Sequence, residues 1–306
     1  MSTTTKVYAN VLAMQSADRM SVERLRRIIE AKSTAEAFKM LGDFGYAYSD
    51  LNSTDRFIVA ETNALIDFID DNCAGERFRN ALTARFRYNN AKLAYKSRFI
   101  EVPADGYYRT ALDCGKIVSG DYADVSKYML AAFEKLDEAE ERRPQAIDLE
   151  LTRAMYREVL ACGVPVAVKY FRAEIDMKNI LSAARMRRLA SDGDEFIDGG
   201  KIDRERLAES VHAEGFADCF GGTPYYDYAA GIEEAEFCEL WKAERDADDF
   251  LYYMTVRDVA NVSSYEPFLN YYTQSLIELK TVKTALVCIK TDSRDAFYAR
   301  IPKIYG

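Results

Sequence analysis

Two groups of acidic residues are the first candidates for chemistry in this sequence. Each lies in a short segment, and the members are Asp67, Asp70, Asp71, Asp246, Asp248 and Asp249. Carboxylates spaced along helices can hold Mg²⁺ against a diphosphate group. The first group, however, places its single acid before its paired acids, which reverses the usual order, and the second group does not supply that order either. Acid clusters of this kind are typical of solvated helix faces.

Other catalytic arrangements lack the necessary residues. His212 is the single histidine, and no serine is framed as Gly-x-Ser-x-Gly, so a hydrolase triad is not predicted. No Gly-x-x-x-x-Gly-Lys-Ser/Thr loop is present. The six cysteines are scattered without CxxC spacing, which favours buried thiols over zinc ligands or disulfides. We therefore predict no catalytic residue, no cofactor and no metal, and we interpret Trp241 as a helix-packing anchor.

The charge balance and composition narrow the class of protein. The 41 Lys and Arg residues against 50 Asp and Glu residues give a net charge of −9, which disfavours binding to nucleic acid. Hydrophobic residues make up 49% and aromatic residues 12% of the chain, enough for a large core. The longest apolar run, residues 159–168, is interrupted by Gly163 and Pro165. We therefore predict no transmembrane segment and no secretory signal peptide.

The elements that would position any functional residue are helices. Ser33-Thr34-Ala35-Glu36 is a capping box that opens one helix. Pro267 suits the first turn of another helix, which then carries apolar residues every three or four positions. These residues are Leu269, Tyr272, Leu276, Leu279, Val282, Leu286 and Ile289. Alternation typical of strands is hard to find, so the predicted fold class is all-α.

A helical pattern recurs three times along the chain. Its copies are centred on Asn90, Asn179 and Glu278, which are 89 and 99 residues apart. Three copies at nearly equal spacing indicate three similar helical units. With breaks at residues 102–106 and near 191–200, the predicted domains are residues 1–105, 106–212 and 213–306.

Each copy combines a polar residue in the middle of the helical pattern with a basic residue up to two turns later. The candidate residues for setting register or contacting a partner are Asn90, Lys92, Asp176, Asn179, Arg185, Glu278, Lys280 and Lys283. A polar side chain inside a helical bundle commonly bonds a neighbouring helix and fixes register, and we prefer that role for the Asn and Glu positions. Direct contact with a partner is the alternative. The basic residues could instead face acidic partner loops.

Several of these segments resemble one known family. Residues 171–185 contain Asp176-x-x-Asn179-Ile180, and Phe196-Ile197-x-Gly199-Gly200 follows. Thr223-Pro224 and Glu266-Pro267-Phe268 come later in the same order as the family's landmarks. Over essentially the whole chain, they resemble the C subunits of bacterial and archaeal V/A-type ATPases, the counterparts of the d subunits of eukaryotic V-type ATPases. Two positions depart from the family pattern: Arg87 stands where an acid is usual, and Leu181 where a lysine is frequent.

The resemblance implies three similar helical domains in a funnel-like, pseudo-threefold arrangement, with no catalytic role. It further implies that the chain seats the central shaft, formed by the D and F subunits, on the membrane rotor ring (c/K ring) and transmits torque between them. The chain would then lie at the cytoplasmic face of the membrane without crossing it. Two alternatives stay open: an all-α, magnesium-dependent diphosphate enzyme of the isoprenoid synthase kind, and a helical adaptor unrelated to ATPases.

Overall fold

The computed structural model describes residues 3–16, 20–48, 53–191, 195–235, 239, 241–256 and 260–305. Within these ranges the chain forms α-helices and short 3-10 helices, and no residue of them belongs to a strand. The predicted all-α class is confirmed. No helix in the described ranges is both long and apolar enough to span a membrane.

The helices follow one another through short connections. In chain order they are α1 (Thr3–Ser16), α2 (Val22–Ile29), α3 (Thr34–Asp43), α4 (Thr54–Asn72), α5 (Glu76–Lys96), η2 (Ala104–Gly106), α6 (Cys114–Ser119), α7 (Lys127–Glu138), α8 (Pro144–Leu160), α9 (Pro165–Leu189), α10 (Arg204–His212), η3 (Ala217–Phe220), α11 (Tyr226–Glu234), α12 (Trp241–Val256), α13 (Glu266–Lys290), α14 (Arg294–Tyr298) and η5 (Lys303–Tyr305).

The predicted helix starts are present, with one change in bonding. The Ser33 hydroxyl accepts from the Glu36 amide at 3.2 Å, as a capping box requires. The Glu36 carboxylate, however, reaches one residue further back than expected and accepts from the Lys32 amide at 2.8 Å. Pro267 lies in the first turn of α13, where a missing amide costs nothing because that amide has no intrahelical partner.

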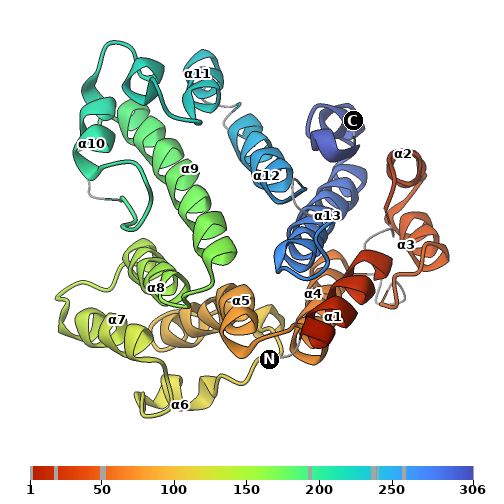
Figure 1. Ribbon diagram of the computed structural model, residues 1–306, viewed down its shortest axis with the longest axis horizontal. Helices are drawn as coiled ribbons and strands as arrows, with labels where there is room; N and C mark the ends of the chain where they lie inside the picture. Colours follow the sequence, from red (N-terminus) through yellow and green to blue (C-terminus); the bar gives the residue numbers. More distant parts are fainter. Residues whose placement is uncertain are drawn as a thin grey trace.

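The three longest described helices, α5, α9 and α13, each organise a group of neighbours (Figure 1). Helix α5 packs against α6 and α8, and α7 covers α8. Helix α9 packs against α10, α11 and α12. Helix α13 packs against α14 and also against α1, α2, α3 and α4. The third group therefore joins the two ends of the chain, while the domain boundaries at residues 105 and 212 stay a prediction.

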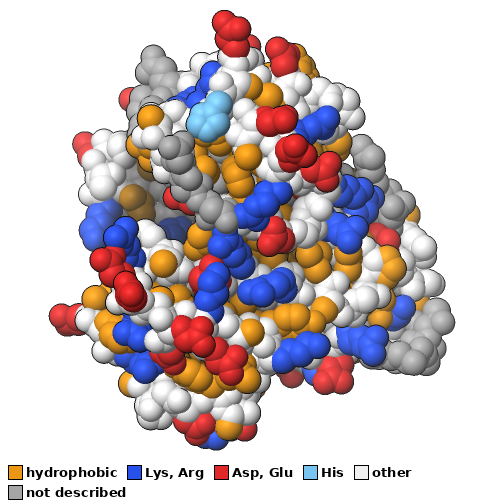
Figure 2. All heavy atoms as spheres, turned by 90° about the vertical axis from the view of Figure 1, so that its left-hand side faces the viewer, with side chains coloured by type: hydrophobic (Ala, Val, Ile, Leu, Met, Phe, Trp, Pro, Cys, Tyr) orange, Lys and Arg blue, Asp and Glu red, His pale blue; other side chains and the backbone are white. Residues whose placement is uncertain are grey.

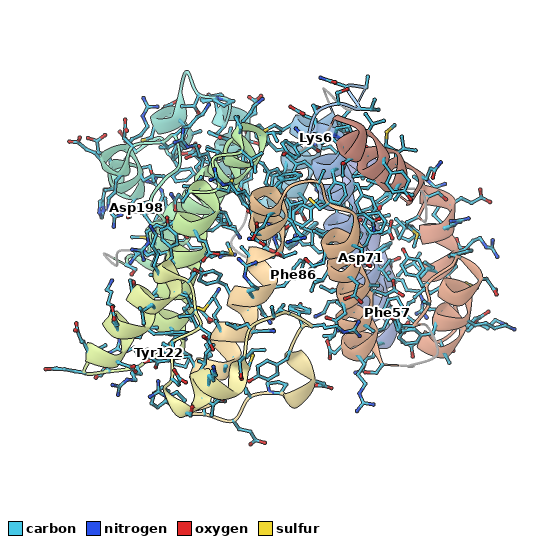
Figure 3. The ribbon with its side chains drawn as sticks, turned by 60° about the horizontal axis from the view of Figure 1, so that its bottom comes forward. Lys6, Phe57, Asp71, Phe86, Tyr122 and Asp198 are labelled. Atoms are coloured by element: carbon cyan, nitrogen blue, oxygen red, sulfur yellow. The ribbon has the colours of Figure 1, made fainter. Side chains whose placement is uncertain are left out.

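Apolar side chains form two separate cores. The larger core follows α5, α8, α9 and the first half of α13. The smaller core joins α2 and α3 to the second half of α13, with Phe57 of α4 at 0% exposure among its members. Figure 3 shows Phe57 beside the helices that form the smaller core. Tyr122 lies on the other side of the molecule, in the lobe formed by α6 and α7. The small core explains why α2 and α3, near the N-terminus, lie beside α13, near the C-terminus.

The remaining singled-out side chains occupy ordinary structural positions. Cys73, Cys114, Cys162, Cys219 and Cys288 are free thiols, and Cys238 lies outside the described residues. His212 is exposed at the end of α10. Trp241 begins α12, with the Arg300 guanidinium 4.7 Å from its ring centroid.

Candidate functional site

A charged cluster joins α5, α9 and α13 at the centre of the molecule. Arg85 of α5 lies 3.3 Å from the Glu174 carboxylate of α9, and its guanidinium lies 5.4 Å from the ring centroid of Tyr272 in α13. The Tyr272 hydroxyl donates to the Leu82 carbonyl at 2.9 Å. Tyr170 packs edge-on against Tyr272 at 6.5 Å. We call Arg85, Glu174 and their buried tyrosine neighbours the central cluster, because it links all three long helices.

The electrostatics of the central cluster keep Arg85 charged. Burial is the largest single effect and disfavours the charge on Arg85, but Glu174 together with Tyr272, Tyr170 and Tyr156 outweighs it and holds the pKa of Arg85 above its ordinary value. Burial also raises the pKa of Tyr156 and Tyr170, and the Glu174 charge adds to that increase. These tyrosines therefore stay neutral, and Tyr156 also makes a side-chain hydrogen bond to Glu174.

Sequence reasoning missed this cluster, although a signal for it was present. Arg85 and Glu174 are 89 residues apart, the same spacing that separates Asn90 from Asn179. The two partners therefore occupy equivalent positions in the first two copies of the repeat. Residues at equivalent positions of two copies can face each other, and opposite charges that do so can pair. A search of the repeat for opposite charges at equivalent positions would have found Arg85 and Glu174.

Asn90 and Asn179 bond the backbone in the same way. The Asn90 amide group donates to the Tyr108 carbonyl at 2.7 Å, and its oxygen accepts from the Tyr108 amide at 2.8 Å. Asn179 makes the same two bonds to Ile197, both at 2.8 Å. In each copy the bonded residue comes 18 positions later. Each asparagine therefore fixes the segment that leaves its long helix.

Asp176 adds a second attachment in the second copy only. Its Oδ1 accepts from the amides of Lys201 at 2.8 Å and Ile202 at 3.0 Å. The turn passes so close that a Cβ atom on Gly200 would lie 2.1 Å from this oxygen, so only glycine fits there. Burial raises the pKa of Asp176, against the lowering effect of these amide bonds.

In the first copy Arg87 takes the position of Asp176 and bonds elsewhere. Its guanidinium lies 2.7 Å from Glu158 of α8 and donates to the Thr83 hydroxyl at 3.0 Å. Arg87 therefore links α5 to α8, whereas Asp176 links α9 to the loop that follows it.

Glu278, in the third copy, is 3% exposed and is bonded to the N-terminal part of the chain. Its carboxylate accepts from the Tyr46 hydroxyl at 2.6 Å. In all three copies the polar residue of the repeat therefore lies inside the fold.

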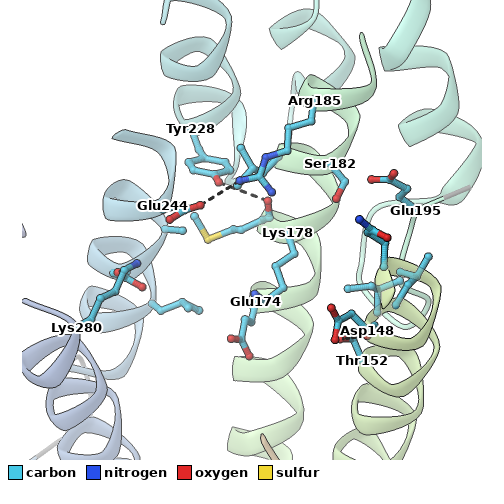
Figure 4. A pocket seen from close by; sticks show the side chains of 18 of the residues that line it. Asp148, Thr152, Glu174, Lys178, Ser182, Arg185, Glu195, Tyr228, Glu244 and Lys280 are labelled. Carbon is cyan, nitrogen blue, oxygen red and sulfur yellow. Dashed lines mark hydrogen bonds and ion pairs between the residues drawn. The ribbon is translucent and has the colours of Figure 1, made fainter. Parts of the chain in front are cut away.

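A cleft of about 730 Å³ opens beside the central cluster (Figure 4). Helices α8, α9, α11, α12 and α13 all contribute to its walls. Its polar and charged lining residues include Asp148, Thr152, Glu174, Lys178, Ser182, Arg185, Glu195, Tyr228, Glu244, Asp248 and Lys280. Apolar side chains, among them Leu149, Met177 and Leu251, lie between them. We call this hollow the central cleft.

Three of the predicted basic residues are paired with acids of neighbouring helices. Arg185 of α9 lies 3.0 Å from Glu244, and Lys280 of α13 lies 2.5 Å from Asp248; both acids belong to α12. Lys283 of α13 lies 3.5 Å from Asp55 of α4. These charges are compensated within the chain.

A further ion pair and a hydrogen bond join α5 to α8. Lys96 lies 2.6 Å from Asp148, and Lys92 donates to the Thr152 hydroxyl at 2.7 Å.

On the outer face formed by α7 to α10, Lys and Arg side chains gather across the middle, with acidic residues above and below them (Figure 2).

The acid clusters that suggested diphosphate chemistry are engaged in other ways. Asp67 lies 2.5 Å from Arg109, and Asp70 lies 3.9 Å from Arg79. Asp246 pairs with Arg245 at 2.7 Å, and Asp249 accepts from the Lys303 amide at 2.8 Å. Across the described ranges, no three His, Cys, Asp or Glu side chains converge as metal ligands would. This arrangement gives no support to the magnesium-dependent alternative.

The comparison with known protein families agrees with the fold. The family described as the ATP synthase (C/AC39) subunit matches residues 11–300, nearly the whole chain. No individual curated protein matches the sequence. The match spans Asn90, Asn179 and Glu278 and most residues of the small core. The chain therefore belongs to the ATP synthase (C/AC39) subunit family, which contains the C and d subunits of V/A-type ATPases.

Proposed function

We propose that this chain is a non-catalytic rotor subunit that seats the central shaft, formed by the D and F subunits, on the membrane rotor ring. The observation that carries the proposal is the central cluster with the central cleft beside it. Three long helices meet at one buried ion pair and then run apart (Figure 1), so a load applied in the cleft reaches all three helix groups. This arrangement suits a mechanical joint that transmits torque during ion transport coupled to ATP.

The family membership supports a place in a rotary ATPase, and the proposal adds the position within it. The chain would bind peripherally at the cytoplasmic face, held by the ring rather than by a segment of its own in the bilayer. The three helix groups would act as a funnel of three domains, with the third closed by the N-terminal helices. Contacts spread over three groups resist sideways slip better than one contact does.

The test is a reconstitution with and without the full-length chain. Purified D and F are mixed with ring-containing membranes, and retained D is measured after washing. We expect the membranes to retain D and F only when the chain is present. Equal retention without the chain, or a chain that binds neither partner, would contradict the proposal.

A second measurement addresses torque. In proteoliposomes that carry the whole complex, omission of the chain should abolish ATP-driven ion uptake while the soluble sector continues to hydrolyse ATP. Magnesium-dependent diphosphate release that is lost in Asp70→Asn/Asp71→Asn would instead favour the enzyme. Binding to other proteins but not to D and F would favour an unrelated adaptor.

A further inference from the structure

A cavity of about 410 Å³ lies between α4 and α5, and it shares no lining residue with the central cleft. Helix α5 supplies much of its wall, because Arg79, Thr83 and Arg87 are four residues apart and share one face of the helix. Residues 110–111, which lead towards α6, also line it. Its volume lies in the usual range for small-molecule sites. We call this cavity the α4–α5 pocket.

One wall of the pocket holds an arginine that is already fixed in place. The Arg87 Nη2 atom lies 2.7 Å from the Glu158 carboxylate. Its Nη1 atom donates to the Thr83 hydroxyl at 3.0 Å and to the Asn80 carbonyl at 3.2 Å. Within the described ranges its Nε atom makes no hydrogen bond. A ligand that accepts from Nε would meet an ordered side chain, which lowers the entropy cost of binding.

The second arginine of the pocket is only loosely bound. The Arg79 Nε atom lies 3.9 Å from the Asp70 carboxylate, and its Nη1 atom lies 3.5 Å from the Asp70 carbonyl oxygen. Both distances exceed the ~2.7–2.9 Å of a strong charge-assisted hydrogen bond. Most of the hydrogen-bonding capacity of this guanidinium is therefore unused by the residues that the structure describes.

Two uncharged side chains add further donors. The Thr110 hydroxyl accepts from the Asn90 side chain at 3.0 Å and from the Leu112 amide at 3.4 Å, which leaves its own proton free to donate. The side-chain amide of Asn80 has no hydrogen-bond partner in the described part of the chain. Four side chains of the pocket therefore carry unused donors.

Asp70 is the one carboxylate among the described residues that line the pocket. Burial is the largest effect on its pKa and raises it. The charges that act on Asp70 are those of Arg79, Asp67, Arg87 and Asp71, and the two arginines oppose the two acids. The pocket thus combines many donors with a single charged acceptor. A matching ligand has several acceptor oxygens and one donor that can face Asp70.

We propose that the α4–α5 pocket binds a hydrogen phosphate group, supplied by inorganic phosphate or by a small phosphate monoester. Its oxygens can accept from Arg79, Arg87 and Thr110, and its P–OH group can donate to Asp70. Sulfate has the same shape but carries no proton at neutral pH, so it would place its lone pairs against the Asp70 carboxylate. The acid therefore selects for phosphate.

This site goes beyond a role as a mechanical joint, because a ligand there would join two helix groups. Asp70 belongs to α4, which packs against α13, whereas both arginines belong to α5, which packs against α8. A group bound to both helices stabilises their contact by an amount that grows with its concentration. The apolar side chains of Ile66 and Ala111 can contact the organic part of a monoester.

The test measures binding of inorganic phosphate, glycerol 3-phosphate and sulfate to the full-length chain by calorimetry at pH 7 and constant ionic strength. We expect one of the two phosphates to bind at least about tenfold more tightly than sulfate. Arg79→Met should weaken phosphate binding about ten- to a hundredfold, because it removes charge-assisted bonds. Asp70→Asn should remove most of the preference over sulfate. Arg56→Met, 65% exposed on α4 and outside the pocket, is the matched control and should bind like wild type.

The outcomes decide both the site and its ligand. Tighter binding of glycerol 3-phosphate supports a monoester, and tighter binding of inorganic phosphate supports the free ion. Absence of binding of either at millimolar concentration overturns the proposal, as does phosphate binding that Arg79→Met leaves unchanged. Sulfate that binds wild type as tightly as phosphate would reveal an unselective patch and would also overturn it. Thermal unfolding without ligand, compared with Arg56→Met, excludes loss of fold, and the selectivity of Asp70→Asn gives an independent readout.

Discussion

The central cluster and the surroundings of Lys92 treat buried charge in opposite ways. In the central cluster a cation and an anion from two helices face each other at 3.3 Å, and their side chains are only 26% and 11% exposed. At Lys92 of α5, burial outweighs the opposing charge of Asp148, which is itself bound to Lys96 at 2.6 Å. A matched pair fixes helices, because either partner alone would be a buried, uncompensated charge. A buried cation that is only partly compensated costs stability.

Among the substitutions that test this contrast, Arg85→Met should have the largest effect on stability. Loss of the guanidinium leaves Glu174 uncompensated in a largely buried site, so we expect a loss of about 3 kcal/mol in the free energy of unfolding. Arg85→Met/Glu174→Met should recover most of that loss, because it removes both charges. Urea unfolding measures both variants, with Arg56→Met, 65% exposed, as the control. A single variant as stable as the control would show that the cluster does not hold the helices.

Asn179→Leu should have the next largest effect. It leaves the amide and carbonyl of Ile197 without their bonds, which costs about 2 kcal/mol. Asn90→Leu should cost a similar amount, because its bonds to Tyr108 have the same geometry. Hydrogen exchange of the Ile197 and Tyr108 amides gives the local readout. Protection that survives at either amide would mean that another contact fixes that segment.

Lys92→Met, unlike the substitutions above, should increase the free energy of unfolding and so stabilise the protein. The pKa of Lys92 is near 8 when folded and 10.5 in the ordinary state, so between these values the unfolded chain binds more protons. The free energy of unfolding of the wild type therefore rises with pH across this window. Below pH 8 the whole cost of burying the charged Lys92 is present. We expect Lys92→Met to gain about 1 kcal/mol or more at pH 7.

Thermal unfolding at pH 7, 8 and 10 checks this prediction. The advantage of Lys92→Met should shrink above pH 8 as the wild type relieves its own penalty. A variant that is less stable than wild type at pH 7 would show that the bond to Thr152 outweighs the burial of the charge.

Arg185→Ala should have the smallest effect. Arg185 and Glu244 are 44% and 48% exposed, so solvent screens their attraction. We expect a loss below about 0.5 kcal/mol that vanishes at high salt. A loss as large as that of Arg85→Met would erase the distinction between the open cleft and the central cluster, and urea unfolding at two salt concentrations decides between them.

Local patterns were enough to predict the all-α class and the starts of particular helices. The hydroxyl of Ser33 and the ring of Pro267 act within one turn of their own helix, so their effect can be derived from adjacent residues. The repeat around Asn90 and Asn179 was also visible, because its spacing is a property of the chain alone. The family landmarks followed from the same local order.

The pairing of distant side chains depended on how the helices pack. Glu278 and Tyr46 are 232 residues apart, and no spacing rule predicts that the two ends of the chain share one core. Which lysines keep an internal acid likewise depended on tertiary structure. Lys280 has Asp248 because α12 lies beside α13, whereas Lys178 of α9 lines the same cleft without an ion pair in the described part of the chain.

The sequence by itself determined the all-α class, the threefold repeat and the family, because these depend on residues near one another or on regular spacing. Tertiary structure alone decided that Arg85 meets Glu174, that both chain ends complete the third helix group, and that Lys92 is buried with Asp148 offsetting only part of the cost. The physical reason is that electrostatic energy depends on distance and burial in space, and neither quantity is set by position along the chain.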